Sequence, residues 1–186
     1  MYANKSLKYY LNDLAARKPA PGGGSAAAFT ASLAAALVSM VINYTIGNPK
    51  YKKYEQELKL VLDKSEKLRA EFLKLTDLDV AAYKSKDARN CLNVPFMAAR
   101  LCFEAVKLCQ PLIKKTNTNL ISDLAIAVIL FESSFSSSWF NVEINLKSLT
   151  DNKFTVNVRK ELSQKQIRIK KIRRQMEAKI GRIIRG

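Results

Sequence analysis

Apolar side chains recur at helical spacing along most of the chain. In residues 5–17 they follow the i, i+3, i+4, i+7 order that marks one face of a helix, with Leu7, Tyr10, Leu11 and Leu14. The same period runs through residues 51–84, 120–149 and 151–186, and no stretch alternates in the way a sheet requires. The pattern predicts an all-α fold, a bundle of about five or six helices forming a single domain over residues 1–186.

Polar and proline residues divide this pattern. Residues 84–93 are polar and are expected to form a loop, after which Asn93 is placed to cap a helix with Pro95 near its first turn. Pro111 should end that helix, and the polar segment 114–119 should form the next turn.

The stretch from Pro19 to Pro49 contains no charged residue, although 26% of the whole chain is charged. Its prolines and glycines stop the preceding helix, and Ser25 is predicted to be the N-cap of a helix over residues 26–46. This helix is long enough to span a bilayer. Because alanine adds little transfer energy and several Ser, Thr and Asn residues interrupt the run, a buried core helix at the centre of the bundle is favoured.

The entrance to that helix is rich in glycine. Gly22, Gly23 and Gly24 leave backbone N–H groups free beside the positive end of the helix dipole, a general anion-binding arrangement. A plain turn between two helices is the alternative. Nucleotide-binding loops are excluded, because no strand leads into the glycines and no G-x-x-x-x-G-K-[ST] is present.

Two carboxylates near the end of the third predicted helix are candidates for chemistry. The apolar stripe of residues 54–82 requires an inward-facing side chain at position 79, and that residue is Asp79. Asp77 lies about 160° away around the helix and should face outward. An inward carboxylate has a destabilised ionised form and a raised pKa, as a general acid or base does. A structural aspartate bonded to a neighbouring helix is the equal alternative.

Composition removes several classes of site. The chain has no histidine, which excludes histidine catalysis and histidine metal ligands. Cys91, Cys102 and Cys109 lack the clustering that zinc needs, so we expect no metal and free thiols in a reducing cytosol. No N-terminal signal is visible, and a cytoplasmic protein without a membrane partner is expected.

The formal net charge is +16, and the predicted last helix, residues 152–186, carries much of it. From residue 151 onward there are 12 Lys and Arg against 3 Asp and Glu. Such a field favours polyanionic partners, including nucleic acid, an acidic membrane surface or a substrate with several carboxylates. A solvated helix that promotes solubility is the alternative.

Several stretches together resemble the cyclodeaminase/cyclohydrolase family of folate metabolism. They are PAPGGGSAAA at 19–28, MVINYTIG followed by KY at 40–51, DLDVAAY at 77–83, VPF at 94–96, NLISDLAIA at 119–127 and NVEINLKSLTD at 141–151. The order and most of the spacing match over residues 7–151. One departure is the short segment between Tyr83 and Pro95, where the family usually carries a longer helical excursion.

The resemblance implies a helical homodimer that hydrolyses 5,10-methenyltetrahydrofolate to 10-formyltetrahydrofolate, with no cofactor beyond the folate substrate. It implies Asp79 as the catalytic carboxylate, with Asp77 second. The glycine turn and Ser25 would bind an anionic or carbonyl part of the folate, and Asp123 would pair with pterin N–H groups. Four further residues fall in matching stretches as binding candidates: Asn43, Ser122, Asn141 and Asn145.

Other functions stay open on the sequence. The same residues suit a formimidoyltetrahydrofolate cyclodeaminase, which closes the methenyl ring and releases ammonia. The basic surface would attract the polyglutamate tail of cellular folates. A non-catalytic helical module could instead use the basic last helix on nucleic acid, although only Phe154 is aromatic beyond residue 151, which disfavours base stacking.

Overall fold

The computed structural model describes residues 1–186 and is all-α, as the sequence predicts. Six α-helices are connected by turns and four short 3-10 segments. The helices are α1 (Leu7–Ala15), α2 (Gly23–Asn43), α3 (Glu55–Ser85), α4 (Ala88–Cys109), α5 (Ile121–Leu146) and α6 (Asn152–Arg185). The 3-10 segments are η1 (Tyr2–Asn4), η2 (Pro49–Tyr54), η3 (Gln110–Lys114) and η4 (Thr118–Leu120).

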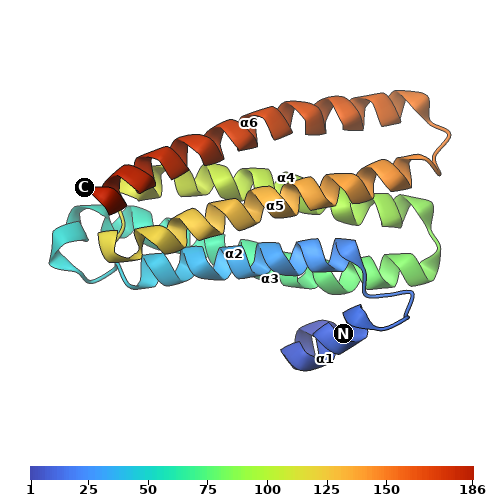
Figure 1. Cartoon of the computed structure of the whole chain (residues 1–186), viewed down its shortest axis with the longest axis horizontal. Helices are drawn as coiled ribbons and strands as arrows, with labels where there is room; N and C mark the ends of the chain where they lie inside the picture. The colour runs from blue at the N-terminus through green and yellow to red at the C-terminus, as the bar shows by residue number, and fades with distance from the viewer.

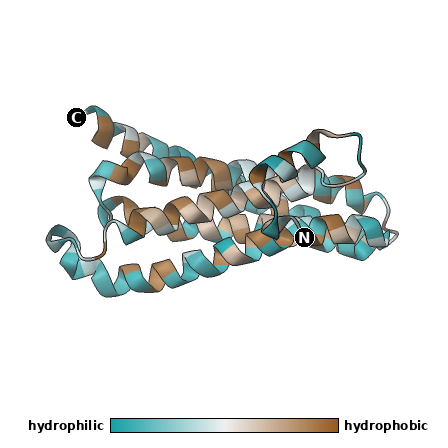
Figure 2. Ribbon diagram, turned by 90° about the horizontal axis from the view of Figure 1, so that it is seen from below, coloured by the Kyte–Doolittle hydropathy of each residue, from teal (hydrophilic) through white to brown (hydrophobic).

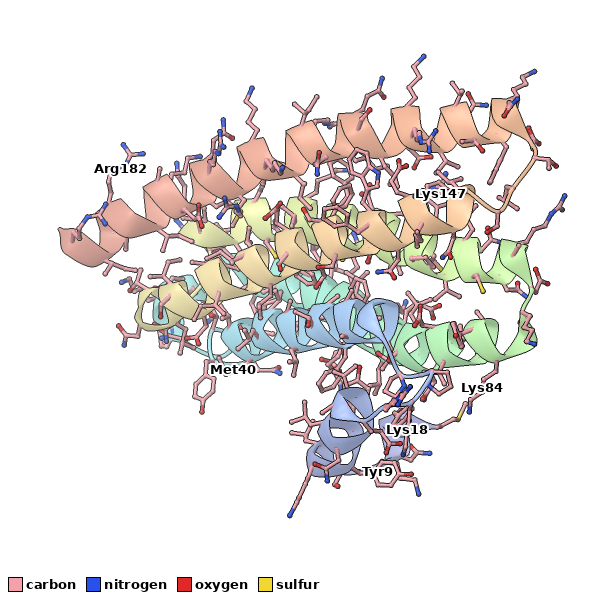
Figure 3. The ribbon with its side chains drawn as sticks, turned by 45° about the vertical axis from the view of Figure 1, so that its right-hand side comes forward. Tyr9, Lys18, Met40, Lys84, Lys147 and Arg182 are labelled. Atoms are coloured by element: carbon pink, nitrogen blue, oxygen red, sulfur yellow. The ribbon has the colours of Figure 1, made fainter.

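Helices α2 to α6 run up and down, each antiparallel to the one before it, and α1 lies outside this bundle (Figure 1). The first turn of α2 therefore lies at the same end as the last turns of α3 and α5 and the first turns of α4 and α6. We call this the glycine end. The opposite end, where α2 finishes and α5 begins, is called the far end (Figure 1). Figure 3 shows Lys84 and Lys147 at the glycine end, and Met40 and Arg182 at the far end.

The core is one cluster of 35 buried residues drawn from α2 to α6 and η3. Within it, Ala31, Ala34 and Ala35 are fully buried, which confirms that the alanine-rich helix lies at the centre. Small side chains let α3 and α5 pack closely on its two sides. Figure 2 shows hydrophobic and hydrophilic residues interleaved along the outer helices, as amphipathic helices require.

Two segments, Gly23–Asn43 and Thr118–Leu146, are long and apolar enough to cross a membrane by length and composition alone. Of their most apolar windows, 61% of the first is buried inside the bundle but only 39% of the second. The first value is that of a core helix. The second shows that α5 carries apolar residues on a face that this chain does not cover.

The start of α2 differs from the prediction. The helix begins at Gly23 with Gly22 as its N-cap, and no side chain caps it. The predicted N-cap role of Ser25 is wrong, because Ser25 lies inside the first turn and its hydroxyl bonds to another helix. Gly23 and Gly24 therefore belong to the first turn of the helix rather than to a loop before it.

The predicted loop over residues 84–93 is also wrong. Helix α3 continues to Ser85 and ends at Lys86, which adopts a left-handed backbone conformation with φ 55°. Asp87 then caps α4 by accepting the backbone N–H groups of Arg89 and Asn90. Pro95 lies within α4 and is buried. The left-handed Lys86 followed by the Asp87 cap connects the two helices by a very short turn. The polar composition of residues 84–93 led to the prediction of a longer loop.

Candidate functional site

The carboxylate of Asp79 lies against the first turn of α2 at the glycine end. A Cβ added to Gly24 would lie 2.7 Å from Asp79 Cγ and 3.0 Å from Oδ2. Only glycine leaves room for the side chain to approach the backbone this closely. The first-turn N–H groups of a helix lack intrahelical partners, so this terminus faces a carboxylate with donors and with the positive end of its dipole.

Two opposing effects act on Asp79. Burial raises the pKa of its carboxyl above the ordinary value, and a hydrogen bond from the Ser25 backbone N–H partly lowers that pKa. Desolvation is the larger effect, so the net shift is upward. A carboxyl with this property is better suited to accept and return a proton near neutral pH than a solvated aspartate.

The hydroxyl of Ser25 is not free to bind a ligand. Ser25 is fully buried, and its Oγ donates to the backbone carbonyl of Thr76 on α3 at 2.9 Å. The same Oγ lies 3.2 Å from the hydroxyl of Tyr10. The predicted binding role of the Ser25 side chain is therefore not supported, and the Ser25 backbone N–H faces Asp79 instead.

Helix α5 supplies two amides to the same end. Asn141 Nδ2 lies 3.8 Å from the position of a Cβ on Gly23 and donates to the Ser137 carbonyl. Asn145 Nδ2 donates to the Cys91 carbonyl at 2.6 Å, which ties α5 to α4. The structure thus brings Asn141 and Asn145 to the glycine end that holds Asp79.

A cavity of about 420 Å³ opens at this end. Its lining includes Cys91 and Asn145, together with Tyr83 and Lys86 from the end of α3. Burial raises the pKa of the Cys91 thiol, and the charge of Asp79 raises it further. The Cys91 thiol also donates to the Ala82 carbonyl at 3.4 Å, one turn along α3 from Asp79. The cavity combines the side-chain amide of Asn145, the aromatic ring of Tyr83 and the positive charge of Lys86. These groups suit a planar, anionic substrate.

Asp77 lies outside this arrangement. Its Oδ1 accepts the backbone N–H of Tyr2, and its Oδ2 accepts that of Ala3 at 3.3 Å. It faces the N-terminal segment, in the direction that helical spacing predicts, away from the first turn of α2. The structure separates the two carboxylates, and Asp77 holds the start of the chain on α3.

Three other predicted site residues lie at the far end. Asn43 and Ser122 are exposed, and Asp123 is partly exposed in the first turn of α5. From Asp123 to Asn141 the helix rises about 27 Å. One copy of the chain therefore does not bring Asn43, Ser122 and Asp123 to the cavity beside Asp79.

Two residues that sequence reasoning passed over contribute to the glycine end. Tyr10 was expected only as one member of an apolar stripe, but its hydroxyl reaches the buried Ser25. Cys91 was considered only as a thiol, but its carbonyl receives Asn145. No sequence signal marks a backbone carbonyl as an acceptor, whereas the tyrosine among leucines on a short helix was a usable signal for Tyr10.

Comparison with known proteins relates this arrangement to a family. Residues 6–88 and 85–164 match the family described as formiminotransferase-cyclodeaminase. The chain is 36% identical to a methenyltetrahydrofolate cyclohydrolase from Methylorubrum extorquens, with 87% of this chain and 89% of that protein covered. It is 29% identical to the formimidoyltransferase-cyclodeaminase of Rattus norvegicus over 85% of this chain, and it spans only 34% of that longer protein.

A solved structure has nearly the same fold. The crystal structure of formiminotetrahydrofolate cyclodeaminase from Thermotoga maritima superposes with a TM-score of 0.93 at 26% sequence identity. The comparison covers 99% of this chain and 100% of that one. Helix α6, which the sequence stretches of the resemblance did not reach, is thus part of the shared fold.

Proposed function

Because the chain belongs to the formiminotransferase-cyclodeaminase family, we propose that it is an enzyme that hydrolyses 5,10-methenyltetrahydrofolate to 10-formyltetrahydrofolate. The cyclohydrolase relative supports this choice, since the match spans most of both proteins. The observation that carries the proposal is the desolvated carboxyl of Asp79 on the glycine turn of α2.

Asp79 has the position and the raised pKa that the reaction requires. Water attacks the electron-poor carbon that bridges the two folate nitrogens, and Asp79 accepts one proton from that water. The tetrahedral centre then collapses to a formyl group, its remaining hydroxyl proton goes to solvent, and the bond from carbon to N5 breaks. Asp79 returns its proton to N5. A positioned carboxyl of this kind typically accelerates such a step roughly 10²–10⁴-fold.

The reaction needs no metal or redox cofactor in this proposal, because the amidinium carbon of the substrate is already electrophilic. The backbone N–H groups of Gly23 and Gly24 would donate to an anionic or carbonyl group of the folate. Asn141, beside Gly23, would add a side-chain amide on the opposite wall.

Cyclodeamination of formimidoyltetrahydrofolate is the second candidate, favoured by the close match to the Thermotoga maritima structure. In that reaction N10 attacks the formimidoyl carbon and ammonia leaves, so Asp79 would serve as the acid for the departing nitrogen. Two assays on the purified protein separate the candidates. Decay of methenyltetrahydrofolate absorbance above the spontaneous rate supports the cyclohydrolase, and ammonia release from the formimidoyl substrate supports the cyclodeaminase. If neither occurs, the enzyme proposal fails.

The proposed enzyme is a homodimer formed through α2 and α5. These helices expose apolar side chains along one side of the bundle: Leu33, Ile126, Ile129, Phe140 and Ile144. Phe140 is 79% exposed, and a row of large exposed apolar residues on one helix face is typical of an interaction surface. A second copy related by a two-fold axis perpendicular to the helices would cover the face and place its far end beside the glycine end of the first.

Such a dimer would complete each site with Asn43, Ser122 and Asp123 of the other copy. Mixing Asp79→Asn and Asp123→Ala proteins after unfolding and refolding them together tests this arrangement. If the residues act across the interface, half the dimers are mixed and each holds one intact site, which restores about a quarter of wild-type activity. No activity above that of the separate variants would contradict the shared site.

The basic surface is proposed to attract polyglutamylated folate in the cytoplasm. Lys86 lines the cavity at the glycine end, and Arg89 lines a second cavity beside it. Replacing both with glutamine should raise KM for polyglutamylated substrate and leave KM for monoglutamylated substrate nearly unchanged. The control is a variant with Lys171→Gln and Arg174→Gln on α6, which removes the same amount of positive charge. Figure 3 shows that nitrogen-tipped side chains project from the outer side of this helix.

If the α6 pair changes KM as much as the Lys86 and Arg89 pair, the attraction is a general field effect rather than a local contact. A steep salt-dependent affinity for generic RNA or DNA that the α6 pair abolishes would instead support the nucleic-acid module.

A further inference from the structure

A buried chain of hydrogen bonds connects α1, α2 and α3 behind the glycine turn. The hydroxyl of Tyr10 lies 3.2 Å from Ser25 Oγ, which donates to the Thr76 carbonyl at 2.9 Å. Since the only proton of Ser25 goes to Thr76, Tyr10 must be the donor to Ser25. Tyr10, Ser25 and Thr76 are each at most 5% exposed, so neither the Tyr10 nor the Ser25 hydroxyl can touch a substrate.

Ser25 makes contact with α3 at two successive levels. Its side chain bonds to the carbonyl of Thr76, and its backbone N–H faces the carboxylate of Asp79, three residues further along α3, which lies against the neighbouring Gly24. Positions three apart lie on the same side of a helix, one turn above each other. The side-chain bond therefore fixes the height of the α2 terminus on α3, and with it the place of the N–H that faces Asp79.

Tyr10 is the only buried residue of α1. Its ring packs against Tyr2 and Phe29, each with ring centroids 5.3 Å away. The segment before α1 is itself held on α3 through the bonds from Tyr2 and Ala3 to Asp77. The N-terminal part of the chain is thus anchored beside the site, and it places the Tyr10 hydroxyl against Ser25, behind the glycine turn.

We propose that Tyr10 is a positioning residue for Asp79 and that it acts through the Ser25 hydroxyl. By donating to Ser25 Oγ, Tyr10 directs the serine proton onto the Thr76 carbonyl, because one hydroxyl proton cannot serve two acceptors. Without Tyr10 the serine rotates more freely, the first turn of α2 moves on α3, and the N–H bond to Asp79 weakens. The inference rests on the proposed function only where kinetics are used to test it.

Few other titratable groups lie near Asp79, and two of them, Tyr83 and Lys86 at the end of α3, line the neighbouring cavity. Tyr10 approaches from α1 and Cys91 from α4, and burial raises the pKa of both, so both stay neutral in the acid range. Asp77 on α3 and Asp87 at the start of α4 are the neighbouring carboxyls, while α2 and α5 present uncharged glycine, serine and asparagine. A change in the titration of Asp79 after a substitution at Tyr10 therefore reports on the Ser25 contact.

The test measures the pKa of Asp79 directly in Tyr10→Phe, with Tyr9→Phe as the matched control. Tyr9 is on the same helix and is 46% exposed. The carboxyl carbon of Asp79 is followed by ¹³C NMR against pH in labelled full-length protein, and its signal is identified by its absence in Asp79→Asn. In Tyr10→Phe the pKa should rise, because the bond that lowers it is weakened, and in Tyr9→Phe it should stay at the wild-type value.

A double-mutant comparison tests the route through Ser25. Ser25→Ala should raise the pKa of Asp79 at least as much, and adding Tyr10→Phe to it should change nothing further. In the kinetic arm, kcat should fall roughly 3- to 10-fold in Tyr10→Phe with KM unchanged. If Ser25→Ala does not fold, the two tyrosine variants still decide the question.

An Asp79 pKa in Tyr10→Phe equal to that in Tyr9→Phe would overturn the inference. An undiminished effect of Tyr10→Phe in the Ser25→Ala background would overturn the route. If wild-type protein shows no turnover of either folate while the NMR shifts occur as expected, the proposed function fails and the positioning role stands.

Discussion

Asp77 and Asp79 are two residues apart on α3 and occupy opposite environments. Asp79 lies against the glycine turn of α2, where burial raises its pKa. Asp77 lies on the other side of the helix and accepts the backbone N–H groups of Tyr2 and Ala3. The comparison shows that one short acidic motif can hold a reactive group and an anchoring group, and that the neighbouring helix decides which is which.

Apart from removal of the carboxylate itself, the largest effect on kcat should come from crowding Asp79. In Gly24→Ala the new methyl group would overlap the carboxylate and displace it from the N–H of Ser25. A displacement of about 1 Å at a reacting group costs about 10²-fold, so kcat for the folate substrate should fall by that order. Steady-state kinetics measure the effect.

Gly181→Ala is the control for helix propensity, since Gly181 lies near the end of α6, where the nearest atoms belong to the flexible Arg185 side chain. It should keep wild-type kcat. Equal kcat values for Gly24→Ala and wild type would show that the carboxylate does not need its place on the glycine turn.

Substitution of Asp77 should act on stability. In Asp77→Asn the charge-assisted bonds to the N-terminal amides become neutral ones, and the free energy of unfolding should fall by about 1 kcal/mol. Urea denaturation measures the change, and faster amide hydrogen exchange at Tyr2 and Ala3 provides an independent check. Unchanged stability with a large loss of kcat would reverse the roles assigned to the two carboxylates.

The smallest expected effect is the contribution of Asp79 to the pH dependence of the free energy of unfolding. Because its folded-state pKa is raised, the protonated carboxyl is the form that the fold favours. Its contribution to stability is fully present below the unfolded pKa and is lost as pH rises through the folded value. Asp79→Asn should therefore gain stability relative to wild type as pH rises from 3 to 7. A difference that stays constant with pH would contradict the raised pKa.

The sequence predicted the helices well because their apolar residues repeat over many turns. It also placed Asp79 inward and Asp77 outward, as the structure has them, since both directions follow from helical spacing alone. The buried thiols of Cys102 and Cys109 are free, as expected.

The misses arose where partners come from distant parts of the chain. Ser25 has the chemistry of an N-cap, and only the packing of α2 on α3 sends its hydroxyl to Thr76 instead. Residues 84–93 have loop composition, but an aspartate cap at Asp87 starts a helix among them. Helical rise predicts that Asp123 and Asn141 lie far apart, yet which of them accompanies Asp79 depends on the antiparallel order of helices.

The most direct measurement is the initial rate of methenyltetrahydrofolate decay for Asp79→Asn beside Asp77→Asn, at equal folded protein concentration. We predict that Asp79→Asn lowers kcat roughly 10²–10⁴-fold, while Asp77→Asn stays within about threefold of wild type. Turnover by Asp79→Asn at the wild-type rate would contradict the assignment of the reactive carboxylate.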